Sequence, residues 1–298
     1  MSAAGLVVRS LEALRGAVMN GCSGALAMLS PASQACPVCG HAFRSAGKAS
    51  FAGLCPACTE AIPWIRGVTC PVCGRPERCG DCLRRTAASF VASRSAVRYD
   101  ESVRSWLALY KYRGHEALLP VLGEMMAAAG LLFLAERRAI YAHFGYDALV
   151  PVPLSEERLA ERGFNQAEQL ASYVGGRLAI PVIEALRRTR NSGKQSFISR
   201  RERMKNTQGL FAAEESRLPE LLRSRLARNA NQSFAAFRAR RRRQAASPAQ
   251  SPLRLLLIDD VYTTGSTIDA CAAALAGALR QLDPEARVEI YALTLARS

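Results

Sequence analysis

Residues 255–267 constrain the fold of this 298-residue chain more than any other stretch. They read Leu-Leu-Leu-Ile-Asp-Asp-Val-Tyr-Thr-Thr-Gly-Ser-Thr. Four consecutive apolar residues predict a buried parallel strand, because a strand covered on both faces needs no alternation of polar and apolar residues. Residues 268–275 follow with helical composition. In an open α/β sheet, ligands bind where such a strand passes through a loop into a helix.

The charge pattern of this loop fits a ribose 5-phosphate. Backbone amides around Gly265, several hydroxyls and a helix N-terminus favour a phosphate. Asp259 and Asp260 would repel the same phosphate, and they suit the vicinal hydroxyls of a sugar or a Mg²⁺. One alternative is the Walker B strand of a nucleotide triphosphatase, but the Gly-x-x-x-x-Gly-Lys-Ser/Thr loop that it requires is absent from the sequence. A second alternative is an ordinary strand–turn–helix that binds no ligand.

The stretch resembles the 5-phosphoribosyl-1-pyrophosphate (PRPP) signature of type I phosphoribosyltransferases at all thirteen positions. The resemblance implies that Asp259 and Asp260 lie at the ribose 2- and 3-hydroxyls. It also implies a 5-phosphate site formed by Thr263, Thr264, Gly265, Ser266 and Thr267.

Cysteine spacing predicts a second kind of site. Four Cys-x-x-Cys pairs lie within residues 36–82, a spacing that lets both thiolates of a pair face one ion. The pairs are Cys36/Cys39, Cys55/Cys58, Cys70/Cys73 and Cys79/Cys82. Eight thiolates fill two structural Zn²⁺ sites of four cysteines each and leave no open coordination position. Sequential grouping of the pairs is favoured over interleaved grouping, and redox-active pairs are disfavoured because such motifs do not come in fours.

Composition adds a prediction about partners. The formal net charge of +15 and the pI near 9.9 favour a polyanion such as nucleic acid, anionic lipid or a heavily phosphorylated substrate. No apolar run approaches the ~20 residues of a membrane span. Arg9, Glu12 and Arg15 interrupt any signal-peptide core, so a cytoplasmic protein with an N-terminal amphipathic helix in residues 1–30 is expected.

Two segments between the cysteines and the signature loop could contribute to the site. Residues 101–138 predict two helices divided near Gly114, with aromatic and basic residues together at 107–114. An amphipathic helix with Trp106, Leu109 and Tyr110 on its core face explains these residues equally well.

Residues 147–153 predict a strand that ends at the stiff turn Pro151-Val152-Pro153, because proline cannot continue a central ladder. Arg158 and Arg162 follow on a helix, and guanidinium groups beside such a turn suit a pyrophosphate. A solvated, charge-rich helix is the alternative.

Two further segments are strongly basic. Residues 187–205 hold a Gly/Asn/Ser-containing run that predicts a mobile loop, either a hood that closes over an anionic substrate or a surface that tracks nucleic-acid phosphates. Residues 214–252 predict an insertion, helical at 218–228 and otherwise disordered. The predicted domains are therefore an N-terminal helix in 1–30, a zinc ribbon in 31–85 and an α/β domain in 86–298.

The order of these motifs resembles the ComF family (ComFC and GntX-like proteins) over residues 30–213 and 253–298. The resemblance rests on the cysteine pairs, Leu-Tyr-Lys-Tyr at 109–112, Val-Pro-Val-Pro at 150–153, Arg-Gly-Phe-Asn-Gln at 162–166 and the signature loop. It implies a zinc ribbon fused to a type I phosphoribosyltransferase-like parallel sheet with helices on both faces, PRPP bound with Mg²⁺, and a role in DNA uptake with a possible competence helicase partner. By position it implies a pyrophosphate loop at 151–154, and a hood that includes Arg190 and Lys194. The family pattern has only a short hairpin at 214–252.

Two functions of different class follow. The first is an enzyme that transfers ribose phosphate from PRPP to a nitrogen acceptor, with Asp259 and Asp260 as the catalytic residues. The second is a non-catalytic module that binds single-stranded DNA on basic grooves and aromatic platforms. The candidate platforms are Tyr110, Tyr112, Phe164 and Phe197. An intact pair of acids in the loop favours the first, since a pure DNA binder gains nothing from it.

Overall fold

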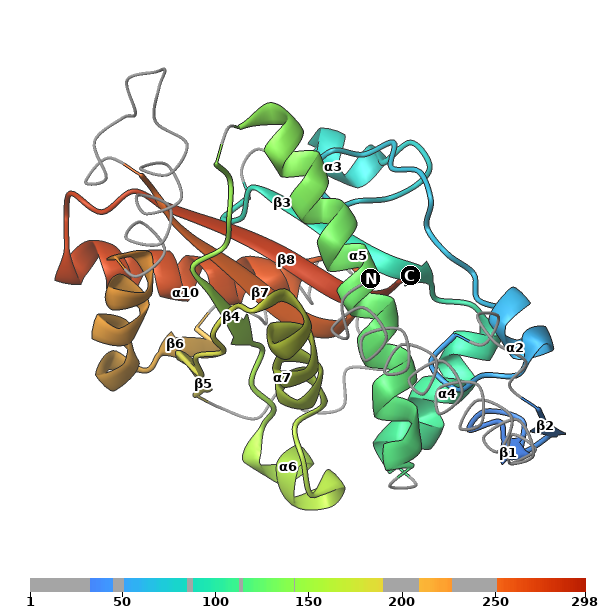
Figure 1. Cartoon of the computed structure of the whole chain (residues 1–298). Helices are drawn as coiled ribbons and strands as arrows, with labels where there is room; N and C mark the ends of the chain where they lie inside the picture. Colours follow the sequence, from blue (N-terminus) through green and yellow to red (C-terminus); the bar gives the residue numbers. More distant parts are fainter. Residues whose placement is uncertain are drawn as a thin grey trace, which may run out of the picture. The chain divides into compact units, whose positions relative to one another are not determined.

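The computed structural model describes residues 33–44, 51–84, 88–112, 115–141, 143–189, 209–226 and 251–298. The chain divides into two compact units, residues 1–60 and residues 61–298 (Figure 1). The first cysteine group lies in the smaller unit and the second in the larger one. The expected N-terminal helix, Arg190, Lys194, Phe197 and residues 227–250 of the expected insertion lie outside the described residues. The expected domain boundary at residue 85 stays a prediction.

The smaller unit is built from short elements around its cysteines. Strands β1 (Gln34–Ala35) and β2 (Ala42–Phe43) pair antiparallel, and helix α2 (Pro56–Glu60) follows. The turn between the strands closes when the amide of Gly40 donates to the carbonyl of Cys36 at 2.9 Å. Gly40 has φ +72°, a conformation that glycine adopts without strain.

A four-stranded parallel sheet forms the centre of the larger unit, in the order β3-β8-β7-β4. The strands are β3 (Ala92–Arg98), β4 (Ala148–Pro151), β7 (Leu253–Tyr262) and β8 (Val288–Arg297). The near-continuous burial of the strands accounts for the apolar runs of β4, β7 and β8, because both faces of the sheet are covered. The predicted α/β class with a parallel sheet is confirmed.

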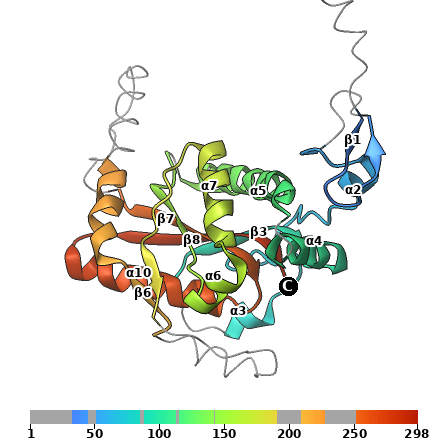
Figure 2. The ribbon, with the colours of Figure 1, turned by 90° about the horizontal axis from the view of Figure 1, so that it is seen from below.

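Helices cover both faces of this sheet (Figure 2). On one face α5 (Leu119–Ile140) and α7 (Gln166–Leu178) pack against each other and the strands, and α10 (Ser266–Leu282) covers the other. Gly123 permits the close approach of α5 to α7, since a Cβ there would lie 2.4 Å from the ring of Tyr173. The strand–helix–strand unit β7–α10–β8 is parallel, as the sequence predicts.

Helix α5 is the one described helix that is long and apolar enough to cross a membrane by length and composition. In the structure 44% of its most apolar window is buried, where it packs on β3, β8 and α7. A core helix of an α/β protein has the same properties.

The remaining elements surround the sheet. They are α3 (Gly80–Arg84), α4 (Glu101–Tyr112), η2 (Glu116–Leu118), α6 (Glu156–Arg162), β5 (Leu186–Arg188), β6 (Phe211–Ala213) and η3 (Glu215–Arg217). Strands β5 and β6 pair antiparallel and flank the basic loop. Residues 218–226 are helical, as expected for the start of the insertion, and Leu218 and Leu221 are buried.

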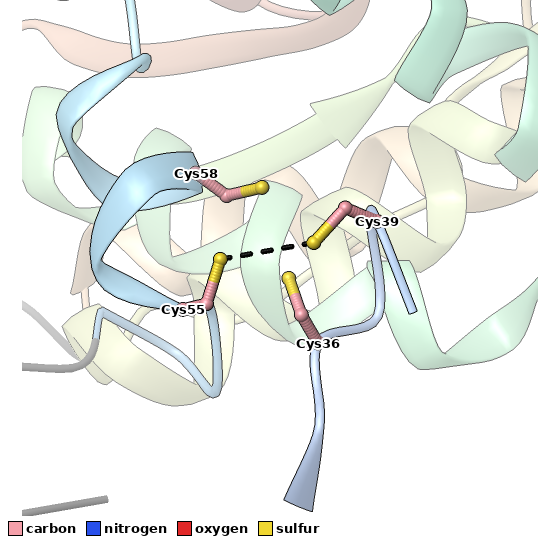
Figure 3. Close-up of side chains that lie close together, drawn as sticks. All are labelled: Cys36, Cys39, Cys55 and Cys58. Carbon is pink, nitrogen blue, oxygen red and sulfur yellow. Dashed lines mark hydrogen bonds between the residues drawn. The ribbon is translucent and has the colours of Figure 1, made fainter. Parts of the chain in front are cut away.

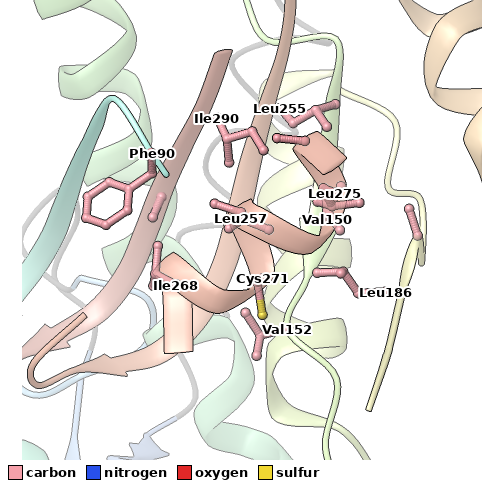
Figure 4. Close-up of a cluster of buried hydrophobic side chains, with 14 of the residues drawn as sticks. Phe90, Val150, Val152, Leu186, Leu255, Leu257, Ile268, Cys271, Leu275 and Ile290 are labelled. Carbon is pink, nitrogen blue, oxygen red and sulfur yellow. The ribbon is translucent and has the colours of Figure 1, made fainter. Parts of the chain in front are cut away.

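A hydrophobic core lies between α10 and the sheet (Figure 4). Leu257 of β7 and Val150 of β4 contribute from the sheet, and Ile268 and Cys271 from α10. Cysteines 70, 73 and 79 belong to the same buried cluster. The second cysteine group is therefore part of the core that supports the loop.

Candidate functional site

Asp259 and Asp260, the two acids of the signature stretch, lie near the C-terminal end of strand β7. The strand includes both acids and continues to Tyr262, because Val261 and Tyr262 still pair with the end of β8. The carboxylate of Asp259 accepts from the amide of Asp260 at 2.9 Å, and that of Asp260 accepts from the amide of Val261 at 2.8 Å. Backbone amides thus fix both side chains.

Gly265 turns the chain from the strand into helix α10. Its φ is +78°, and a Cβ there would lie 2.1 Å from the hydroxyl of Tyr262. Both the backbone conformation and the lack of space therefore require glycine. Tyr262 itself is buried, so its ring has no free volume to move into.

The N-terminus of α10 has no side-chain cap. Thr264 and Ser266 lie with their hydroxyl oxygens 3.0 Å apart, and the amide of Ser266 donates weakly to Thr264 Oγ1 at 3.4 Å. First-turn amides of a 17-residue helix and several hydroxyls thus surround one position, an arrangement that favours an anion.

Lys111 forms an ion pair with Asp260. Both side chains are largely buried, with 18% and 19% of their surface exposed. Burial raises the pKa of Asp259 well above its usual range, and the charge of Asp260 raises it further. Burial opposes ionisation of Asp260 too, but the Lys111 ammonium outweighs it and lowers the pKa of that carboxyl. The two neighbouring acids are therefore different: Asp260 is the anion and Asp259 holds a proton more readily.

A cleft of about 190 Å³ opens beside the acids. Its lining joins both acids with four basic side chains, Lys111, Arg158, Arg162 and Arg188. Of the expected phosphate residues Thr267 lines the cleft, and residues 263–266 do not. Of the expected pyrophosphate loop Val152, Pro153 and Leu154 line it, whereas Pro151 is buried at the end of β4.

Contacts with neighbouring helices hold the turn after β4 in place. Asn165 caps α7 and donates from Nδ2 to the carbonyl of Val152 at 3.2 Å. Arg162 donates to Gln166 Oε1 at 2.7 Å and to the hydroxyl of Tyr112 at 3.1 Å. Its guanidinium lies 5.1 Å from the centre of the Tyr112 ring. Arg162 thus connects the end of α4 to the start of α7.

Arg158 and Arg188 concentrate positive charge on the same side of the cleft. Burial lowers the pKa of Arg188, and the like charge of Arg158 lowers it further. Two guanidinium groups that repel each other in this way are stabilised by an anion between them, because it compensates both charges at once. The cleft therefore has an acidic side at β7 and a basic side at α6 and β5.

The eight paired cysteines gather into two groups in the sequential arrangement. The four Sγ atoms of Cys36, Cys39, Cys55 and Cys58 lie within 4.8 Å of one another and point toward a common centre (Figure 3). Cys70, Cys73, Cys79 and Cys82 form the second group to the same limit. All eight are free thiols, so no disulfide competes with a metal. Four thiolates in so small a volume are the ligand set of a structural Zn²⁺ site.

Backbone hydrogen bonds lower the pKa of one thiol in each cysteine group. Burial alone would raise the pKa of Cys36, but hydrogen bonds from the backbone of Cys55, Cys39 and Val38 outweigh it and lower the pKa to about 6. Burial likewise opposes ionisation of Cys79, and hydrogen bonds lower its pKa to about 7. Each group therefore contains a thiol that ionises near neutral pH, which is the form that binds metal.

Comparison with known proteins finds similar sequences among bacterial competence and DNA utilization proteins. It is 28% identical to "Competence protein ComFC" of Bacillus subtilis over 256 residues, covering 82% of this chain and 84% of the relative. It is 27% identical to "Competence protein F" of Haemophilus influenzae, with 83% and 91% covered, and 25% identical to "DNA utilization protein YhgH" of Escherichia coli, with 75% and 84% covered. These relatives, each similar over most of the chain, support the resemblance to the ComF family. No family model and no solved structure matches the chain.

The structure adds Lys111 and Arg188 to the predicted site. Both line the cleft beside the expected acids, together with Arg158, which the sequence already places beside the turn after β4. Lys111 lies in the 107–114 stretch whose basic and aromatic residues suggest a site, and the competing core-face explanation also holds, because Trp106 and Tyr110 are buried. Within helix α4, Lys111 therefore lines the cleft while Trp106 and Tyr110 pack into the core.

One predicted aromatic platform is wrong. Tyr110 is only 1% exposed, packs on Phe164 at 5.4 Å and donates to Gln169 Oε1 at 2.6 Å, so it cannot stack on a base. Tyr112, two residues later on α4, is 62% exposed. The helical period places these two residues on different faces, which the composition of the stretch does not reveal.

Proposed function

We propose that this chain binds PRPP together with Mg²⁺ in the cleft at the end of β7. The observation that supports this most strongly is the joining of two acids and four basic side chains in one cleft. A sugar that carries a phosphate at one end and a pyrophosphate at the other needs this division of charge. Each part of the ligand is assigned to the residues whose chemistry suits it.

The 5-phosphate binds at the α10 N-terminus, on amides and hydroxyls of residues 263–267. Asp259 and Asp260 accept hydrogen bonds from the ribose diol. Pyrophosphate lies along Val152 and Pro153, where Arg158, Arg162 and Arg188 face it. Mg²⁺, held chiefly by the ligand's own phosphates, neutralises charge that the arginines leave uncompensated.

We further propose that the bound PRPP transfers its ribose phosphate to a nitrogen acceptor. The bond between C1 and the pyrophosphate oxygen breaks, and its electron pair leaves with pyrophosphate. The lone pair of the acceptor nitrogen forms the new bond to C1, and the proton that nitrogen sheds passes to the released pyrophosphate. The arginines stabilise the charge that develops on the leaving group. Asp259 and Asp260 hold the ring that becomes electron-poor.

Titration calorimetry with Mg²⁺ and PRPP tests the binding proposal. We expect the wild-type chain to bind PRPP, and the double change Asp259→Asn and Asp260→Asn to abolish binding. The matched control, Asp283→Asn with Glu285→Gln, neutralises two acids at the opposite end of α10 and should leave the affinity unchanged. A wild-type chain that does not bind PRPP, or an acid variant that binds as well as wild type, contradicts the proposal.

We propose binding of single-stranded DNA as a second function. Relatives named for competence and for DNA utilization support a role in DNA uptake for this chain as well. Tyr112 is an exposed ring with the Arg162 guanidinium over it, which is the kind of platform on which an unpaired base stacks. The net charge of +15 supplies the attraction to phosphates.

Fluorescence anisotropy with a labelled oligonucleotide tests the second function. We expect binding that weakens steeply with salt, survives the Asp259→Asn/Asp260→Asn double change, and weakens by about 1–3 kcal/mol in Tyr112→Ala. Tyr141→Ala, which removes a half-exposed ring at the end of α5, is the matched control. Equal loss in both tyrosine variants would show that Tyr112 is no platform, and loss in the acid variant would mean one site rather than two.

A further inference from the structure

Arg297, the last residue of β8, forms hydrogen bonds with the backbone at the start of the signature loop. Its Nη1 donates to the carbonyl of Tyr262 at 3.0 Å and to that of Thr263 at 2.8 Å. Its guanidinium lies 4.5 Å from the centre of the Tyr262 ring. These two carbonyls lie at the start of the loop whose amides we assign to the proposed anion site. The orientation of Arg297 therefore affects where those amides point.

The other edge of the same guanidinium faces the second cysteine group. Nη2 of Arg297 donates to Cys73 Sγ at 3.9 Å, and both residues are buried. No acidic side chain of the described residues forms an ion pair with Arg297, and its Nε has no hydrogen-bond partner there. A guanidinium that is only 6% exposed needs an anion close by. On the Nη1 side the backbone oxygen of Ser298 also accepts from this guanidinium. On the Nη2 side four thiolates around one Zn²⁺ would carry a net charge of −2 and supply negative charge beside Cys73.

Two more contacts connect the region of the second cysteine group to the loop. The amide of Ser89 donates to Asp269 Oδ1, in the first turn of α10, at 2.7 Å. The ring of Phe90 meets the ring of Tyr262 edge-on, with 6.5 Å between their centres. The cysteine turn itself is pressed against β3, since a Cβ on Gly74 would lie 2.6 Å from the carbonyl oxygen of Ser93. These contacts form a packed route from this turn to the base of the loop.

We propose that Arg297 is a positioning residue that couples metal occupancy of the second cysteine group to the anion-binding geometry of the loop. The metal-loaded group fixes Nη2, and Nη1 then fixes the carbonyls of Tyr262 and Thr263. The proposal rests on the proposed PRPP site. Because coupling between the affinities of two binding sites is reciprocal, PRPP must in turn tighten metal binding in the second group. The first group belongs to the other unit of the chain, and we expect it not to respond.

Arg297→Lys is the variant of choice, since it keeps the charge and loses the fork that reaches both partners. Its matched control is Arg98→Lys, at the position of β3 that pairs with Arg297. The Arg98 side chain is 59% exposed and pairs with Glu77. Zinc release from the full chain is followed with a chelator, and Cys36→Ser identifies the phase that belongs to the first group. Hydrogen exchange of amides 262–268 gives a readout that needs no ligand.

We expect Mg²⁺ and PRPP to slow zinc release from the second group and not from the first. Arg297→Lys should keep two zinc ions, bind PRPP about tenfold more weakly, and lose the effect of PRPP on release. Removing zinc from wild type should raise exchange of amides 262–268, and Arg297→Lys should raise it with zinc bound. Arg98→Lys should behave as wild type throughout.

Three results separate the possible failures. If wild type does not bind PRPP, the proposed function fails, and the exchange data still decide the coupling. If PRPP binds wild type and Arg297→Lys alike, the positioning role is wrong while the proposed function stands. If loop exchange is the same with and without zinc, no coupling exists, whatever the affinity for PRPP.

Discussion

Replacing Lys111 with methionine tests the electrostatic account of the acid pair. The change leaves two adjacent carboxylates in a partly buried position without their cation. Removing one partner of a buried ion pair costs about 3–5 kcal/mol, and the Lys111–Asp260 pair retains some exposure, so a loss near 3 kcal/mol is expected. Arg104→Met, at an exposed position of the same helix, is the matched control and should change the free energy of unfolding by less than ~0.5 kcal/mol.

Urea unfolding followed by tryptophan fluorescence measures this effect. Both tryptophans, Trp64 and Trp106, lie in the unit of residues 61–298, and Trp106 is on the same helix as Lys111. A double-mutant cycle with Asp260→Asn isolates the pair, and a coupling energy of about 2–3 kcal/mol is expected. Equal stability of Lys111→Met and Arg104→Met would show that the Lys111–Asp260 ion pair does not stabilise the fold.

The pH dependence of the same variant gives an independent check. The ammonium of Lys111 lowers the pKa of Asp260 in the folded chain, so the stabilisation is present above the unfolded-state value near 3.8 and is lost as the pH falls. The stability difference between wild type and Lys111→Met should therefore be full at neutral pH and shrink below about pH 4. A difference that stays constant into acid would show that packing, not charge, causes it.

The remaining predictions concern the loop turn and the metal groups. Gly265→Ala should destabilise the chain by more than ~1 kcal/mol, through its positive φ and the clash with Tyr262, whereas Gly277→Ala in the same helix has open space and should be neutral or stabilising in a thermal melt. Mass spectrometry of metal content should find two zinc ions per chain, one in Cys36→Ser and two in Cys271→Ala, because Cys271 belongs to neither group. Unchanged zinc content in Cys36→Ser would contradict the first site.

Local sequence patterns predicted those parts of the molecule that depend on neighbours in the chain. The apolar run before Asp259 identified a buried parallel strand, and Gly265 marked the turn that follows it. The Cys-x-x-Cys spacing predicted the two groups and their sequential order. In each case the physical requirement, whether burial on both faces, a positive φ or two thiolates facing one ion, involves residues close in sequence.

Contacts between distant residues could not be predicted in the same way. The ion pair of Lys111 with Asp260 depends on how α4 packs beside β7, and composition alone left the role of that helix open. The burial of Tyr110 follows from the rotation of the helix, and its neighbour Tyr112 shares the same local pattern. Arg297 is an unremarkable residue at the end of a strand until the fold places it between the loop and Cys73.

Calorimetric titration of the zinc-loaded chain with PRPP and Mg²⁺ tests whether PRPP binds in the cleft at the end of β7. We predict saturable binding of one PRPP per chain that disappears when Asp259 and Asp260 are both changed to asparagine and persists in the Asp283→Asn/Glu285→Gln control. Absence of binding to the wild-type chain, or equal binding by the asparagine variant, would contradict it.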